Sequence, residues 1–223
     1  MYAKSINSLA KSSNFFQQAK VDQSNQHLPA RTADEIKKMA NLLNSERIML
    51  IFGHYNVELI LQENSIRVSN LNSNGVMRTC AIVNFSLSIP DWLQNTHNKI
   101  YQGESIGKTI KNGGFNLNKE DIYFGLAKLP KFVKDKMETN DASAAIHLYQ
   151  LIVENPKNGE SIAYCTITEV HSPLYLTLED LHQLSPKGFQ KYNILTNSVQ
   201  KYLDEFISLD KWVGQSSSNI TLA

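Results

Sequence analysis

Two turn-forming segments restrict the fold of this chain more than any other feature of its sequence. The first, residues 72–75 (Asn-Ser-Asn-Gly), precedes the β-rich stretch Val76–Leu87. The second, residues 154–160, joins two stretches with strand character, Ala145–Val153 and Ser161–Val170. Asn-Gly turns and loops rich in Asn, Pro and Gly connect antiparallel strands. The sequence therefore predicts an antiparallel sheet that is built from hairpins.

Helical periodicity dominates the segments around these hairpins. Residues 32–35 (Thr-Ala-Asp-Glu) have the pattern of a capping box and predict a helix through Leu43. A second helical stretch is predicted from Glu46 to Leu61, with an interruption near Gly53, so that the two stretches form a helix–turn–helix hairpin.

Further elements follow along the chain. A short helix is expected at Asp91–Ile100, a helix or turn over residues 103–114, and a strand at Asp121–Gly125. Residues 178–212 have the apolar spacing of one amphipathic helix, whose apolar face we expect to cover the sheet. Helices first, then hairpins with helical inserts, indicate an α+β fold with an antiparallel sheet flanked by helices.

The polar composition of the two ends suggests how the chain is divided. Residues 1–30 are rich in Ser, Asn, Gln and Lys and predict an N-terminal arm, and residues 214–223 predict a flexible tail. A single domain is expected over residues 31–213, a length sufficient to bury a real core.

The charge balance and the hydropathy pattern exclude several classes of partner. Lys and Arg number 22 against 21 Asp and Glu, so there is no overall positive field for a nucleic acid or an anionic membrane. The longest apolar run, Ile48–Phe52, is too short to span a bilayer, and no secretory signal is evident, so we expect a cytoplasmic protein. Cys80 and Cys165 lie in apolar strand-like segments and are expected to be buried thiols without a disulfide.

Sequence motifs for common cofactors are absent. Residues 103–109 end in Gly-Lys-Thr, but three residues rather than four separate the glycines, so a nucleotide phosphate loop is not expected. The six histidines show no metal-ligand spacing, and we predict no metal site. Arg78 and Glu169 are isolated charges in apolar strands, where a charge either faces solvent or meets a partner or ligand. Composition leaves both alternatives open.

Four short motifs, in order along the chain, resemble the chorismate pyruvate-lyase family. They are residues 43–61 with the core Arg-Ile-Met-Leu and Val-Glu-Leu-Ile-Leu, residues 105–107 (Ser-Ile-Gly), residues 158–160 (Asn-Gly-Glu), and residues 168–175 (Thr-Glu-Val-His-Ser-Pro-Leu-Tyr). The resemblance implies a chorismate lyase-like fold with about six antiparallel strands. It also implies an enzyme without a cofactor, which removes pyruvate from chorismate and leaves 4-hydroxybenzoate.

The resemblance assigns roles to individual positions. Arg78 is most similar to the family's carboxylate-binding arginine, and Ile106 matches the position whose backbone N–H meets the same carboxylate. Tyr55 or Asn56 occupies the corresponding helix-turn region. Glu169 resembles the acidic residue that faces the ring hydroxyl, where it orients the substrate or relays a proton.

An alternative register gives a different prediction. If Gly159 and Tyr175 are both matched without a gap, Thr166 rather than Glu169 falls on the acidic position, and a shift of three residues along a strand moves a side chain to the opposite face. A threonine cannot act as a carboxylate base. The alternative function is therefore a non-catalytic module that binds a small aromatic acid, similar to the UTRA effector domains of bacterial regulators. In both cases the expected partner is a small molecule.

Overall fold

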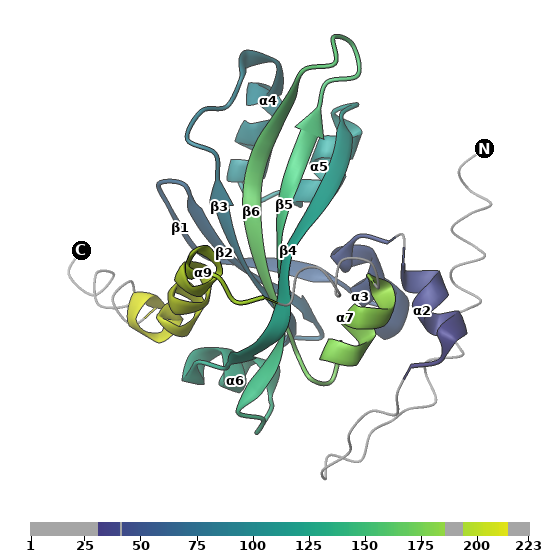
Figure 1. Cartoon of the computed structure of the whole chain (residues 1–223), viewed down its shortest axis with the longest axis vertical. Coiled ribbons are helices and arrows are strands. Elements are labelled where there is room, and N and C mark those ends of the chain that lie inside the picture. Colours follow the sequence, from purple (N-terminus) through teal and green to yellow (C-terminus); the bar gives the residue numbers. More distant parts are fainter. Residues whose placement is uncertain (1–30, 41, 186–193, 214–223) are drawn as a thin grey trace.

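The computed structural model describes residues 31–40, 42–185 and 194–213. Its centre is a six-stranded antiparallel sheet with the order β1-β2-β3-β6-β5-β4 (Figure 1). The predicted α+β fold with an antiparallel sheet is thus confirmed, whereas the predicted arm (1–30) and tail (214–223) lie outside the described residues. The strands are β1 (Asn56–Glu63), β2 (Ile66–Ser73), β3 (Val76–Phe85), β4 (Asn116–Lys128), β5 (Ser143–Glu154) and β6 (Ser161–His171).

Both predicted hairpins are confirmed. Asn74 and Gly75 connect β2 to β3 with positive φ angles of 54° and 81°, as a tight turn between twisted antiparallel strands requires. Residues 155–160 connect β5 to β6, with Gly159 at a φ of 75°. These two turns set the β2–β3 and β5–β6 registers, which help to align the polar side chains of the candidate site.

The predicted helix over residues 46–61 is wrong in its second half. Helix α3 (Asn44–Phe52) ends at Gly53, whose φ of 72° and N–H bond to the Met49 carbonyl close the last turn. The apolar residues that follow form β1, which pairs along its length with β2. As a strand, this run packs Ile60 and Leu61 against the apolar cluster on one face of the sheet.

The prediction of one helix over residues 178–212 is also wrong, because its described residues form separate helices. Helix α7 (Leu178–Leu184) and helix α9 (Asn197–Ile207) each begin at their own threonine N-cap, Thr177 and Thr196. The sequence between them contains Pro186 and Gly188, which are unfavourable inside a helix.

The predicted helix through Leu43 ends earlier, at Met39, because Leu43 is already the N-cap of α3, whereas the two helices expected after residue 90 are confirmed. The capping box at Thr32 and Glu35 begins α2 (Ala33–Met39), and α4 (Asp91–Tyr101) and α5 (Ile106–Asn112) occupy the expected segments. Helix α6 (Lys131–Met137) carries the lysines of its segment, while Val133 and Met137 on its other side are buried. Cys80 and Cys165 are buried free thiols.

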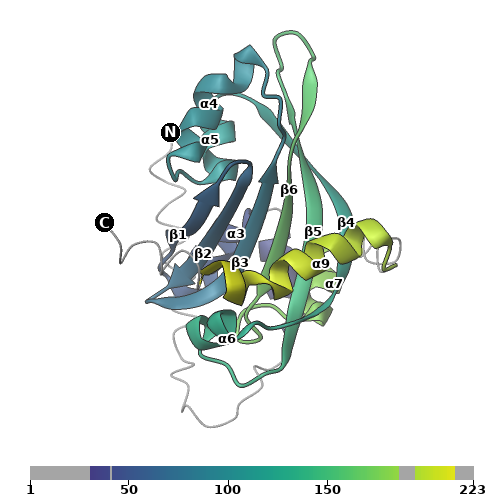
Figure 2. The same cartoon turned by 90° about the vertical axis from the view of Figure 1, so that its left-hand side faces the viewer.

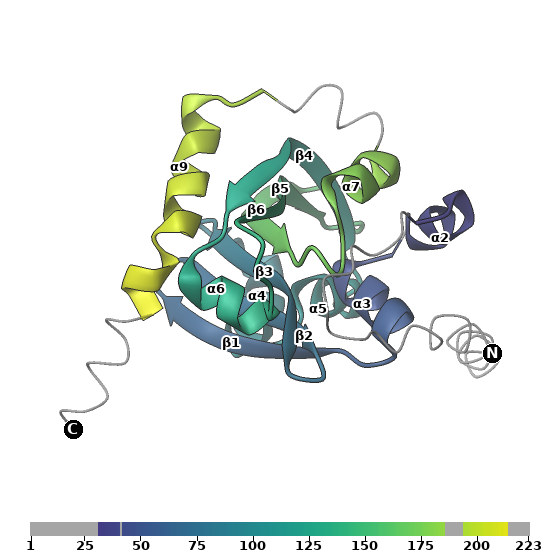
Figure 3. The same cartoon turned by 90° about the horizontal axis from the view of Figure 1, so that it is seen from below.

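Helices cover both faces of the sheet. Figure 3 shows α9 on one side and α2, α3 and α7 on the other, and Figure 2 shows α9 crossing the strands. The face under α9 and α6 buries an apolar cluster that includes Val68, Ile82, Ile146, Val170 and Phe206. The opposite face carries two clusters, one under α4 and α5 and one under α2, α3 and α7. This second face also carries the buried polar residues described next.

Candidate functional site

A row of side chains crosses the sheet on the face that α3 covers. The strand registers place Ser69 of β2, Ala81 of β3, Glu169 of β6 and His147 of β5 opposite one another. Partners opposite one another in neighbouring strands point to the same face. Glu169 is only 6% exposed. A carboxylate is therefore buried near the middle of the sheet.

Helix α3 contributes the first contact to this carboxylate. The side-chain amide of Asn44, the first residue of α3, donates to Glu169 Oε1 at 2.9 Å and to Thr79 Oγ1 at 3.2 Å. The Tyr175 hydroxyl donates to Asn44 Oδ1 at 2.7 Å, which fixes the orientation of the amide. Burial and the nearby Glu169 carboxylate raise the pKa of Tyr149 well above its usual value. Burial lowers the pKa of Lys119 to about 8, and the Glu169 charge partly offsets this shift. Hence Glu169 accepts a hydrogen bond from Asn44 and lies near two further buried groups, the Tyr149 hydroxyl and the Lys119 ammonium.

His171 lies next to Glu169 on the same strand face. Its Nδ1 is 3.0 Å from Thr79 Oγ1, and its Nε2 is 3.9 Å from Glu169 Oε2. Burial, followed by the charge of His147, lowers the pKa of His171 well below its usual value. The imidazole is therefore neutral at pH 7.

A second polar group continues from this row to the edge strand β4. His147 Nε2 is 2.8 Å from Asp121 Oδ1, and Lys119 Nζ is 3.3 Å from His147 Nδ1. The same ammonium lies 3.7 Å from the centre of the Tyr149 ring. Burial and then the Lys119 charge lower the pKa of His147 to about 3. His147 is thus a neutral group that connects Asp121 to Lys119.

Arg67 supplies a buried positive charge on the same face. It lies on β2, two residues before Ser69, and is 2% exposed. Its guanidinium donates to Ser69 Oγ and to the carbonyls of Ile100, Gly103 and Glu104, which uses four of its five N–H groups. Burial lowers its pKa. Among the described residues, no carboxylate lies within salt-bridge distance of it.

Tyr55 lies close enough to Arg67 and Glu169 for their charges to act on its pKa. Burial raises this pKa most, Glu169 raises it further, and Arg67 and the nearby Ser105 and Ser45 side chains lower it. Ser105 is the N-cap of α5, so Ile106, the first residue of that helix, is next to this contact.

Gly107 brings α5 close to the start of α3. A Cβ at this position would lie 3.0 Å from the Leu43 side chain, so a larger residue would require this side chain to shift by a few tenths of an ångström. The Ser-Ile-Gly motif at residues 105–107 therefore places the start of α5 against the start of α3, beside Tyr55.

Three of the predicted site residues lie elsewhere. Arg78 is at a bulge in β3, with its guanidinium 4.1 Å from the Phe52 ring centre and its Nε without a hydrogen-bond partner. Thr166 pairs with Asn84, which bonds to Glu205 of α9, so Thr166 faces the opposite side of the sheet. Asn56 is an exposed residue at the start of β1. The structure brings together Glu169, Tyr55 and Ile106 only.

Sequence reasoning missed Arg67, Asn44 and His171. Arg67 between Ile66 and Val68 is an isolated charge in a strand, the same signal that selected Arg78. Its segment alternates apolar and polar residues, a pattern that suggests a solvated face, whereas α4 and the loop after it cover Arg67. Only the fold could show that Arg67 is buried rather than solvated.

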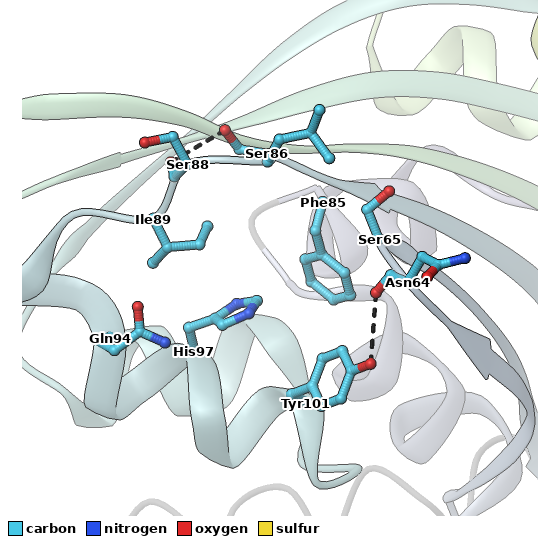
Figure 4. A pocket seen from close by; sticks show the side chains of 10 residues that line it. Asn64, Ser65, Phe85, Ser86, Ser88, Ile89, Gln94, His97 and Tyr101 are labelled. Atoms are coloured by element: carbon cyan, nitrogen blue, oxygen red, sulfur yellow. Dashed lines mark hydrogen bonds between the residues drawn. The ribbon is translucent and has the colours of Figure 1, made fainter.

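A separate open groove lies at the far end of β3. Phe85, Ile89, His97 and Tyr101 line it, and its volume is about 600 Å³ (Figure 4). The Tyr101 hydroxyl donates to the Asn64 carbonyl across its rim. Its lining contains no Asp, Glu, Lys or Arg. Burial lowers the pKa of His97, which favours the neutral imidazole at pH 7. This groove therefore lacks a cation for a carboxylate ligand.

Comparison of the sequence with protein-family models finds no match, and no curated protein matches it. Within residues 31–40, 42–185 and 194–213, no helix has the length and apolar character to cross a bilayer. The same residues contain no group of three or more His, Cys, Asp and Glu side chains arranged to hold a metal ion.

Proposed function

We propose that the protein is a chorismate lyase-like enzyme, which eliminates pyruvate from chorismate to give a hydroxybenzoate without a cofactor. One observation carries this proposal: a buried carboxylate, Glu169, and a buried arginine with no carboxylate partner among the described residues, Arg67, share one face of the sheet, and the charges of both act on the pKa of Tyr55. Such a pair suits a ligand that has a carboxylate at one end and a hydroxyl at the other.

The carboxylate of the ring is assigned to Arg67 rather than to Arg78. A buried positive charge without a counter-ion favours an anionic ligand, and Arg67 retains one N–H for it. Arg78 lies against Phe52. Burial lowers its pKa, and the charge of Glu138, at the end of α6, partly offsets this shift. Ile106, at the start of α5, supplies a backbone N–H on the same side as Tyr55.

In this proposal Glu169 is the general base of the chemical step. As the ether C–O bond breaks, its electrons leave with the pyruvyl enolate, and Glu169 accepts the ring hydrogen as a proton, so that the ring becomes aromatic. The enolate then takes up a proton at its methylene carbon and becomes pyruvate. A positioned general base contributes roughly 10²–10⁴-fold to such a step, and aromatisation supplies the driving force.

The direct test is turnover by the purified protein. Incubation with chorismate should release pyruvate and 4-hydroxybenzoate in equal amounts, well above the rate without protein. Absence of both products would contradict the enzyme. Saturable binding of 4-hydroxybenzoate without turnover would favour the alternative function, a module that binds a small aromatic acid.

A further inference from the structure

A buried hydrogen-bond donor beside Glu169 has no partner. His171 Nε2 makes no hydrogen bond within the described part of the chain, and the imidazole is only 1% exposed. The nearest acceptor, Glu169 Oε2, is 3.9 Å away, beyond hydrogen-bond distance. Buried polar groups of native proteins are nearly always paired, so an orphan at this place needs an explanation.

The surroundings of His171 favour a proton on Nε2, because the Glu169 carboxylate lies on that side of the ring and Thr79 Oγ1 lies at Nδ1. Asn44 Nδ2 donates to Thr79 Oγ1, and the Thr79 hydroxyl hydrogen is then available for His171 Nδ1. A neutral imidazole that accepts at Nδ1 carries its hydrogen on Nε2. The unpaired atom is therefore a donor, and it lies on the Glu169 side of the ring.

We propose that His171 and Glu169 together select a hydroxyl group on the ligand, with His171 donating to the hydroxyl oxygen and Glu169 accepting its hydrogen. This inference rests on the proposed function and names the ligand group that the site recognises. An oxygen about 2.8 Å from both atoms would see them at an angle of about 90°, which a hydroxyl group accommodates. The lowered pKa of His171 supports a neutral donor.

The chemistry of this pair distinguishes three ligands of nearly equal size. The phenolic oxygen of 4-hydroxybenzoate accepts one hydrogen bond and donates another. The amino group of 4-aminobenzoate donates to Glu169 but accepts poorly, because its lone pair is delocalised into the ring. Benzoate does neither. A site that is built to pair a hydroxyl group rejects analogues that leave its buried polar groups unpaired.

The experiment is a titration of the wild-type protein with each of these three acids. The wild type should bind 4-hydroxybenzoate at least about 10-fold more tightly than 4-aminobenzoate, and benzoate most weakly. In His171→Phe the preference for hydroxyl over amino should disappear, while both acids should still bind more tightly than benzoate through Glu169. His171→Gln keeps an N–H donor and should retain part of the preference.

A matched control is His97→Phe. His97 bonds to Tyr164 and lines the separate groove, so this variant should keep the wild-type order of affinities. If His171→Phe does not fold, Thr79→Val serves instead. It removes the hydroxyl that fixes the tautomer and should weaken the same preference.

Two results would overturn the inference: a wild type without the hydroxyl preference, or an unchanged preference in His171→Phe. Chorismate turnover, measured on the same wild-type sample, separates this inference from the proposed function. Turnover with an unchanged preference in His171→Phe rejects the role of His171 alone. Loss of the preference without wild-type turnover supports the hydroxyl site and rejects the lyase.

Discussion

The two faces of the sheet are built from the same strands but bury different chemistry. Under α9 and α6 the strands present aliphatic side chains such as Ile82 and Ile146, which pack against Phe206. Under α3 the neighbouring positions are Glu169, His147 and His171, each less than 10% exposed. Apolar burial stabilises a fold, whereas buried polar groups usually cost stability and cluster at functional sites. Both faces bury apolar clusters that stabilise the fold, and our proposal places ligand binding on the second face because only that face also buries this polar group.

The largest effect is expected from a cavity under α9. Phe206 is fully buried, so Phe206→Ala should lower the free energy of unfolding by about 3–5 kcal/mol, through lost apolar burial and an unfilled cavity. Urea unfolding measures this change. The affinity of the folded fraction for 4-hydroxybenzoate should be unchanged, and a loss of affinity would show that the two faces are not separable.

On the α3 face, removal of the Glu169 charge should lower the turnover rate more than the stability of the fold. Glu169→Gln keeps the shape of the side chain but removes the proton acceptor, so turnover of chorismate should fall by about 100-fold or more, equivalent to about 2.7 kcal/mol. Steady-state assays measure it. Glu205→Gln is the control, because Glu205 accepts from Asn84 on the α9 face, and its turnover should stay near that of the wild type. Equal losses in the two variants would contradict the assignment of faces.

Acid should also lower the free energy of unfolding, through the buried histidines of the polar face. His147 has a pKa of about 3, and burial lowers the pKa of His171 as well, whereas an unfolded histidine titrates near 6.5. The unfolded state then binds more protons below about pH 6.5, so stability is present above that pH and is lost as the pH falls.

Between about pH 7.5 and 5.5 the loss from His147 should be about 1.4 kcal/mol, and His171 should add to it. Urea unfolding at these pH values measures the total loss. His147→Gln should show a smaller loss than the wild type. A wild type with the same stability at both pH values would show that the histidines are not buried in their neutral form.

The smallest effect is expected at the position that the alternative register selects. Thr166 faces the α9 side, so Thr166→Ala should leave chorismate turnover and 4-hydroxybenzoate affinity within about twofold of the wild type. Surface-like substitutions away from a site typically change stability by about 0.5 kcal/mol or less. Loss of turnover in this variant would instead favour the ungapped register, in which Thr166 falls on the acidic position.

Local signals in the sequence were sufficient for the hairpins. Asn74-Gly75 and the loop before Gly159 mark them because positive φ angles require these residue types. The sequence did not predict β1, because a short apolar run fits a helix or a strand until its partner is known. The break between α7 and α9 had a local signal, Pro186 and Gly188, which the apolar periodicity on either side obscured.

The candidate site was less predictable because it depends on register and on what covers each face. Glu169 and Tyr55 were selected through a resemblance, and the structure places them within reach of one another. Arg67 and Arg78 look alike as isolated charges in strands. Only the bulge in β3 and the loop after α4 distinguish the arginine that lies against Phe52 from the one that is buried beside Tyr55.

The central claim is that the polar face under α3 is the ligand site, and a crystal structure of the protein grown with 4-hydroxybenzoate tests it most directly. The account predicts the ligand hydroxyl between Glu169 and His171, and the ligand carboxylate on the Arg67 side near Tyr55. Ligand bound in the groove beside Phe85 and His97, with the polar face unchanged, would contradict it.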